Sequence, residues 1–228
     1  MTTILLTGAT RGIGAAIAAR FQQENVTLIG TGSADGDLAD PATPARLWRS
    51  ALDRLDGRID VLINNAGIFE GASIDLPDVE WTVAWDRTMQ VNLSASAELC
   101  RFAVRHFREP GGGRIVNMAS RAAYRGDGPD NWSYAASKGA MVAMTKTIAR
   151  AYASEGIYAF AICPGFTMTG MADDYLSSRG GAQLLADIPL GRVAEPDEVA
   201  EVTAFAALRA PPSMTGAVLD INGASYVR

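Results

Sequence analysis

The sequence has little histidine and cysteine, and each shortage narrows what the protein can do. His106 is the only histidine among 228 residues, so one chain cannot build a multi-histidine metal site. It lies in a basic helix end, not near a nucleophile, which argues against a Ser-His-Asp hydrolase. Cys100 and Cys163 are far apart and form no metal or redox motif, so we expect buried free thiols in a reducing cytoplasm.

The chain also lacks an excess of positive charge and any long apolar run. A formal net charge of −5 argues against binding to nucleic acid or to an anionic membrane surface. No run of 18 apolar residues occurs, so no transmembrane helix is expected. A strand predicted from Thr3 leaves no room for a signal peptide. We therefore expect a cytoplasmic protein that binds neither membranes nor nucleic acid.

Hydrophobic and charged residues, at 48% and 20%, are typical of a globular chain with a large core. The length predicts a single domain over residues 1–228. Strands and helices are expected to alternate, which favours a parallel sheet with helices on both faces. Strands are predicted at 3–7, 26–30, 59–63, 114–119, 157–163 and 217–221. Helices are predicted at 15–23, 44–55, 78–107 with a break near 88–92, 133–155 and 196–208; segment 121–132 is predicted to be irregular.

A tyrosine and a lysine four residues apart, Tyr134 and Lys138, share one face of the helix predicted at 133–155. A fixed ammonium beside a phenol favours the phenolate, so we expect Tyr134 to serve as a general acid/base. Only two lysines occur in the chain, against eighteen arginines, and Lys138 is one of them. Two ordinary surface neighbours on an amphipathic helix would show the same spacing.

Glycines follow the first predicted strand in Thr7-Gly8-Ala9-Thr10-Arg11-Gly12-Ile13-Gly14 and lead into a helix. Gly8 permits a tight turn, Gly12 lets a phosphate approach the backbone, and Gly14 lets the helix pack closely. The helix N-terminus then attracts a pyrophosphate. The turn therefore favours dinucleotide binding, although a simple glycine-rich connection would look the same.

The end of the second predicted strand bears on which dinucleotide is bound. A carboxylate there binds the adenosine ribose hydroxyls and repels a 2′-phosphate. This chain has Gly30-Thr31-Gly32-Ser33 instead, and Arg11 could reach the same pocket. These residues favour NADP, with NAD as the alternative because Asp35 and Asp37 follow closely.

Two further polar groups interrupt apolar stretches. Asn64-Asn65-Ala66-Gly67 follows the third strand, where ligands sit in open α/β sheets. Asn92 lies within a long apolar run, where an amide needs partners. It is either a satisfied core residue or part of a proton path.

Taken together, these motifs resemble the short-chain dehydrogenase/reductase family over nearly the full length. The matching residues are Thr7-Gly8-x-x-x-Gly12-Ile13-Gly14, Asn64-Asn65-Ala66-Gly67, Asn92, Ser120, Tyr134-x-x-x-Lys138 and Pro164-Gly165-x-x-x-Thr169. Ile188–Arg192 and Leu219–Gly223 look most like the 3-oxoacyl-(acyl-carrier-protein) reductases. The resemblance implies a Rossmann-type, doubly wound α/β fold and an oxidoreductase that transfers hydride between a nicotinamide cofactor and a carbonyl or secondary alcohol.

The resemblance also implies residue roles. Tyr134 exchanges the proton, Ser120 orients the substrate oxygen, Lys138 holds the nicotinamide ribose, and Asn92 positions a water. The residues implied in cofactor binding are Gly8, Thr10, Arg11, Gly12, Ile13, Gly14, Thr31, Asp37, Leu38, Asn65, Ala66, Gly67, Tyr134, Lys138, Pro164, Gly165, Thr167 and Thr169. A substrate lid is expected at about 167–190, and candidate pocket residues are Ile68, Phe69, Arg121, Tyr124, Trp132, Met168 and Met171.

Two departures from the family pattern stand out. Between Gly30 and Asp37 there is no room for the usual crossover helix and strand, so we predict six strands with the third, edge strand and its helix missing. Ser120 and Tyr134 are slightly further apart than usual, and the loop 125–132 is expected to absorb the difference.

Three questions stay open at this point. The substrate is either a small carbonyl or alcohol compound or an acyl carrier protein thioester, for which Arg101, Arg105 and Arg108 would supply a basic patch. A non-catalytic NAD(P)-binding sensor is the alternative to an enzyme. Family members form homotetramers or dimers through the long helices, so we expect a homo-oligomer here.

Overall fold

The sheet at the centre of the computed structural model is parallel throughout. The structure describes residues 1–109, 111–169 and 181–228. Within these residues the sheet has six strands in the order β2-β1-β3-β4-β5-β6. The prediction of six strands is confirmed. The strands are β1 (Thr2–Thr7), β2 (Val26–Thr31), β3 (Val61–Asn64), β4 (Gly113–Met118), β5 (Ile157–Pro164) and β6 (Val218–Ile221).

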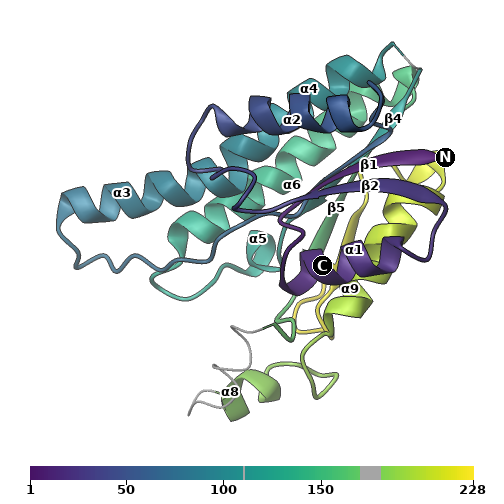
Figure 1. Cartoon of the computed structure of the whole chain (residues 1–228). Coiled ribbons are helices and arrows are strands. Elements are labelled where there is room, and N and C mark those ends of the chain that lie inside the picture. The colour runs from purple at the N-terminus through teal and green to yellow at the C-terminus, as the bar shows by residue number, and fades with distance from the viewer. Residues whose placement is uncertain (110, 170–180) are drawn as a thin grey trace.

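Helices cover both faces of this sheet (Figure 1). They are α1 (Gly12–Phe21), α2 (Thr43–Arg54), α3 (Asp78–Met89), α4 (Ala95–Phe107), α5 (Ala122–Arg125), α6 (Trp132–Tyr152), α8 (Gly181–Ala186) and α9 (Pro196–Ala204). Successive strand residues point to opposite faces, so Leu5 packs with α2, α4 and α6 while Ile4 and Leu6 pack with α1 and α9. This burial on both faces explains why the strands are continuous apolar runs.

The strand order reverses at β1, and this places the crevice of the fold. β2 pairs with one side of β1 and β3 with the other, so the connections after β1 and β3 diverge at the carboxyl edge of the sheet. The Thr7 hydroxyl, at the end of β1, accepts the backbone N–H groups of Asn65 and Ala66 at 3.1 Å each. Two of the predicted motifs therefore meet at the topological switch point.

Two local predictions need correction. The break expected near 88–92 is a π-helix over Gln90–Ser94 that joins α3 to α4 without interrupting the helical path. Part of the segment predicted to be irregular forms α5, because the Ser120 hydroxyl accepts the Ala122 N–H at 3.1 Å and starts a turn. Of the lid expected at about 167–190, residues 170–180 lie outside the described residues, and α8 follows them.

A short loop replaces the missing crossover between β2 and α2. The Asp37 carboxylate accepts the N–H of Ala39 at 2.9 Å, and the Gln90 side chain donates to the carbonyl of Leu38 at 3.3 Å. These contacts fold the loop back toward the helix that carries Asn92. Asp37 and Leu38, which the family resemblance implies in cofactor binding, thus lie in a structured turn.

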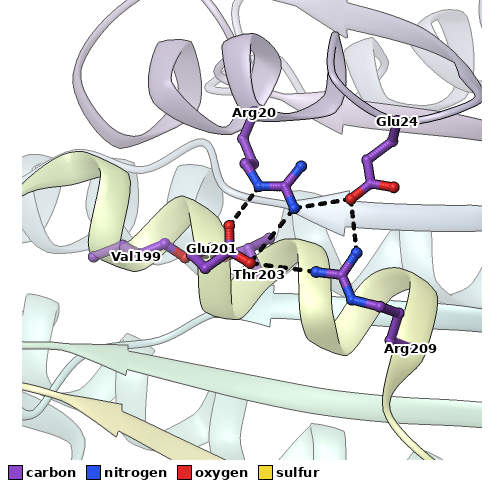
Figure 2. Close-up of polar contacts among 6 residues, drawn as sticks. All are labelled: Arg20, Glu24, Val199, Glu201, Thr203 and Arg209. Atoms are coloured by element: carbon purple, nitrogen blue, oxygen red, sulfur yellow. Dashed lines mark hydrogen bonds and ion pairs between the residues drawn. The ribbon is translucent and has the colours of Figure 1, made fainter.

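An ion-pair network ties α1 to α9 on the other face of the sheet (Figure 2). Glu24 lies between Arg20 at 2.8 Å and Arg209 at 2.7 Å, and Glu201 pairs with the same two arginines. Thr203, within the same helix, donates to the carbonyl of Val199 at 2.8 Å. The network fastens the first helix after the glycine turn to the C-terminal part of the chain.

Candidate active site

The glycine turn after β1 is packed so tightly that side chains are excluded. Gly8 has a φ of +67°, and a Cβ there would lie 2.8 Å from the Cα of Ala66. A Cβ on Gly14 would lie 1.8 Å from the carbonyl oxygen of Gly8. Gly12, with a φ of +52°, faces the side chain of Thr169. These glycines are thus needed for the close packing of the turn, which leads into the N-terminus of α1, where a pyrophosphate binds in folds of this kind.

The amide cluster after β3 fixes the other wall. The Asn65 side chain donates to the carbonyls of Thr7 and Gly8 at 3.1 and 2.9 Å, which locks the loop against the glycine turn. A Cβ on Gly67 would lie 3.3 Å from Asn92 Oδ1 and 3.4 Å from Lys138 Nζ. The structure therefore brings the glycine turn, the amide cluster and the predicted catalytic helix together along one edge of the sheet, and these residues fit a dinucleotide.

Lys138 is almost wholly buried and is held by the main chain. Its ammonium donates to the carbonyl of Met118, at the end of β4, at 2.8 Å, and it is 4% exposed. Burial lowers the pKa of Lys138 to about 8. The group is therefore charged at neutral pH but close to its titration.

Tyr134 lies one turn earlier, with Lys138 Nζ 5.7 Å from the centre of its ring. The expectation of a lowered phenol pKa is wrong for this structure. Burial, the largest cause, raises the pKa of Tyr134, and the hydrogen bond with the Ser120 hydroxyl opposes it. Phe69 packs its ring edge-on at 4.8 Å and contributes to this burial. Tyr134 is thus protonated at physiological pH, because its pKa is raised further from an already high value.

Asn92 is fully buried, and both its amide N–H groups and its amide oxygen have hydrogen-bond partners. Its Oδ1 accepts the N–H of Ile68 at 2.8 Å, and its Nδ2 donates to the Ile68 carbonyl at 2.9 Å and to Ser137 Oγ at 3.3 Å. Ser137 in turn donates to the carbonyl of Tyr134 at 2.7 Å. Asn92 is therefore a satisfied core group that also joins the amide cluster to the catalytic helix. Spacing alone did not reveal Ser137, because any residue before Lys138 would have fitted the pattern.

An acidic side chain, Asp35, lies at the end of β2, where the sequence left the choice between NADP and NAD undecided. The Asp35 carboxylate accepts the N–H of Gly32 at 2.8 Å, so it folds back onto the strand end. A Cβ on Gly32 would meet the Thr10 side chain, which places the glycine turn beside this point. Thr31 is buried and Arg11 is exposed on the neighbouring turn. A carboxylate and a guanidinium thus flank the region where an adenosine ribose is expected.

Of the residues predicted after the fifth strand and in the substrate pocket, only some lie near Ser120. Pro164 is the last residue of β5 and Gly165 follows it, and Thr167 donates to the carbonyl of Gly165 at 3.2 Å. Trp132 is exposed, whereas Arg121 is buried beside Ser120. Met171 lies outside the described residues.

The arginines expected to form a basic patch lie elsewhere. Arg108 pairs with Glu155 at 2.7 Å. Arg108 lies shortly before β4 and Glu155 shortly before β5, so the pair lies at the opposite edge of the sheet from Tyr134. Arg101 pairs with Glu98 at 3.5 Å on the same helix. Arg108 therefore does not border the site.

Some site types find no support in the described part of the chain. No group of three or more histidine, cysteine, aspartate or glutamate side chains there could hold a metal ion. Among the helices described, none is both long and apolar enough to cross a membrane.

Comparison with known proteins gives a consistent result. A family model described as enoyl-(acyl carrier protein) reductase matches residues 30–224. The chain is 31% identical to the 3-oxoacyl-(acyl-carrier-protein) reductase FabG of Vibrio harveyi, covering 98% of this chain and 96% of that protein. It is 33% identical to the short-chain reductase protein NovJ of Streptomyces niveus, covering 96% and 92%.

A solved structure is similar over the whole fold. The crystal structure of 3-ketoacyl-(acyl-carrier-protein) reductase from Brucella melitensis complexed with NADH matches with a TM-score of 0.86 at 27% identity, covering 99% of this chain and 98% of that one. The chain belongs to the short-chain dehydrogenase/reductase family and is an NAD(P)-dependent oxidoreductase that acts on a carbonyl or an alcohol.

Proposed function

We propose that the protein interconverts a small carbonyl compound and its secondary alcohol, with Tyr134 as general acid/base and NADPH preferred over NADH. The observation that carries this proposal is the convergence of three side chains: Tyr134 hydrogen-bonds Ser120, and Lys138 lies 5.7 Å from the tyrosine ring. When bound, the nicotinamide cofactor supplies or accepts the hydride. The protein's own groups then have to orient the substrate oxygen and move one proton.

The three side chains divide this work. In the reductive direction Tyr134 gives its proton to the carbonyl oxygen, and Ser120 donates a second hydrogen bond that orients the same oxygen. The charged Lys138 stabilises the phenolate that remains. Because burial raises the pKa of Tyr134, the phenol keeps its proton at neutral pH, which suits a general acid.

The proposed cofactor residues surround the crevice described above. The glycine turn, Asn65, Ala66 and Gly67 would hold the pyrophosphate and nicotinamide ribose, and Pro164–Thr167 with Thr169 the nicotinamide end. Arg11 and the backbone after Thr31 would hold a 2′-phosphate, which supports the preference for NADPH. Asp35 acts against it, since its carboxylate already accepts the Gly32 N–H.

The test is direct. We expect the purified protein to bind NADPH, seen as a change in nicotinamide fluorescence, and to oxidise it when given ketones. Tyr134→Phe should keep cofactor binding but slow turnover by about 10² to 10⁴-fold, the usual contribution of a general acid. Cofactor binding without turnover of any carbonyl or alcohol in a broad panel would favour the non-catalytic sensor instead.

A second candidate is a 3-oxoacyl-(acyl-carrier-protein) reductase, the name borne by the Vibrio harveyi relative. It would make acyl carrier protein a partner. Of the arginines expected to receive that acidic partner, Arg108 lies at the opposite edge of the sheet and Arg101 is paired with Glu98, so support rests on the relatives alone. Comparing a 3-oxoacyl thioester on the carrier protein with the same acyl group on a short thiol tests it: only a carrier-dependent enzyme favours the former.

We also propose that the protein is a homo-oligomer, a tetramer or a dimer, of the cytoplasm. The support is on α3, where Val79 and Val83 are exposed one turn apart, 75% and 61% respectively. Trp81 and Trp85 stack at 5.3 Å on the same helix. Light scattering coupled to size exclusion should give a multiple of 24.0 kDa, and Val83→Glu should reduce it.

A further inference from the structure

Arg121 follows Ser120 directly, and the proposed mechanism makes no use of it. Its backbone N–H donates to the carbonyl of Pro164 at 3.0 Å, which joins the end of β4 to the end of β5. Its guanidinium lies over the ring of Phe166, 4.8 Å from the ring centre. The side chain is therefore held between the serine loop and the Pro164–Gly165 loop, at the edge of the sheet where the substrate must bind.

This guanidinium is buried, and among the described residues it forms no ion pair. Arg121 is 9% exposed, and within the described residues its Nη1 is buried with no hydrogen-bond partner. Asp187, a carboxylate that acts electrostatically on Arg121, is already paired with Arg125 at 2.7 Å. Burial lowers the pKa of Arg121, and the positive charge of Arg125 adds to the effect.

An unpaired buried cation is costly, because the protein does not replace the hydrogen bonds and charge compensation that water gave it. Proteins tolerate such a group where a ligand supplies the missing anion. A guanidinium presents a planar fork of N–H donors that matches a carboxylate with two parallel hydrogen bonds. The planar fork of N–H donors and the unsatisfied Nη1 both favour binding of an anionic oxygen ligand.

The position of Arg121 ties that ligand to the reacting centre. Ser120, its chain neighbour, hydrogen-bonds Tyr134. The backbone of Arg121 is hydrogen-bonded to Pro164 and its guanidinium lies over Phe166, so Arg121 is held at the same end of the sheet as Ser120. An anion held by Arg121 would therefore belong to the same molecule as the carbonyl that Ser120 and Tyr134 engage.

We propose that the substrate is an oxo acid or hydroxy acid whose carboxylate is bound by Arg121 while its carbonyl or hydroxyl oxygen is bound by Ser120 and Tyr134. The inference rests on the proposed function, since it assigns the substrate class of the same site. It gives Arg121 a role in specificity and leaves proton transfer to Tyr134.

The test uses substrate pairs that differ only in this charge. Acetoacetate and 4-oxopentanoate are compared with their methyl esters, using wild-type protein, Arg121→Met and the control Arg105→Met, an exposed arginine of α4. We expect wild type to favour each acid in kcat/KM. Arg121→Met should lose about 30- to 1,000-fold on the better acid, as for truncation of a buried charge partner, and little on its ester. Arg105→Met should behave as wild type.

A binding measurement supplies a readout that is independent of turnover. Calorimetric titration of the oxidised-cofactor complex with each acid should give binding to wild type and a matching loss in Arg121→Met. Arg121→Lys keeps the charge but not the fork, so it should recover part of the acid preference. Arg121→Lys also replaces Arg121→Met in these measurements if Arg121→Met does not fold.

The outcomes separate this inference from the function on which it rests. If the protein bound no cofactor and turned over no substrate, the proposed function would be wrong. Turnover of esters equal to or better than that of both acids in wild type would overturn the assignment of Arg121 and leave the function intact. Equal losses on acid and ester in Arg121→Met would also overturn it, because a structural role would affect both.

Discussion

The Asn92 side chain and the peptide group of Ile68 form a reciprocal pair of hydrogen bonds, with N–H donated in both directions at 2.8 and 2.9 Å. The Asn92 amide thus bonds both backbone groups of Ile68, as a neighbouring strand does in a β-sheet. It therefore holds the loop after the amide cluster to the π-helix that carries Asn92.

Replacing Asn92 should cost stability as well as activity. Asn92→Ala removes the partners of the N–H and carbonyl of the half-buried Ile68, at a cost of about 1–3 kcal/mol in total. Asn92→Asp keeps an acceptor for the N–H but opposes the Ile68 carbonyl with an oxygen. Urea denaturation measures both. Ser137→Ala, which removes one longer contact, should show a smaller loss; a residue acting only in a proton path would leave the free energy of unfolding unchanged.

The rate of carbonyl reduction should fall above about pH 8. Lys138 has its pKa lowered to about 8, so it is charged below that pH and neutral above it. A neutral lysine no longer stabilises the phenolate left by Tyr134, whose own raised pKa keeps it protonated throughout this range. A pH profile of kcat/KM checks this.

The second lysine of the chain gives a matched control for that profile. Lys146 is exposed on the same helix, so Lys146→Met should keep the wild-type profile. Lys138→Met should be slow at every pH and should lack the descending limb. A limb that persists in Lys138→Met would assign it to another group.

Asp35 and Arg11 should shift the cofactor preference in opposite directions. Asp35→Ser frees the Gly32 N–H and removes a negative charge, so affinity for NADPH should rise by about tenfold relative to NADH. Arg11→Ala should weaken NADPH binding and leave NADH binding nearly unchanged. Dissociation constants from fluorescence titration measure both ratios. Asp53→Ser, an exposed charge deletion on α2, is the control, and an unchanged ratio in Asp35→Ser would show that this carboxylate does not face the ribose.

Glu198 should contribute to resistance against acid. Arg192 binds its carboxylate at 2.7 and 2.9 Å and the Glu195 N–H adds a third contact, so its pKa is lowered from 4.5 to about 2. The unfolded chain binds this proton first, so the contribution is complete above pH 4.5 and is lost as pH falls toward 2. Glu198→Gln should therefore be less stable at neutral pH and show a smaller loss of stability on acidification. Glu80→Gln, at an exposed site on α3, should keep the wild-type dependence.

The parts of the site that could be predicted are those where the local geometry requires one particular type of residue. Gly8 and Gly14 sit where no Cβ fits, and Asn65 caps the glycine turn, so the motifs reported the local geometry directly. The missing crossover could be predicted because chain length forbids it. The helix α5 was missed because it is a single turn, started by one hydroxyl.

The direction of the Tyr134 pKa could not be predicted from its spacing to Lys138. Burial by Phe69 and other residues distant in sequence outweighs the ammonium, and such burial is a property of the packed structure. The position of Arg108 is different: α4 runs back toward the start of β4, so its C-terminal arginines had to lie at the amino edge of the sheet. That deduction was available from chain direction alone.

The loss of the usual third strand leaves β2 as an outer strand, paired with β1 alone among the described strands. Its unpaired backbone groups could template a foreign strand, the common route to unwanted association. The loop that follows β2 carries Asp35, Asp37 and Asp40, and these like charges discourage such pairing. We therefore expect variants that neutralise all three carboxylates to favour NADPH to become less soluble.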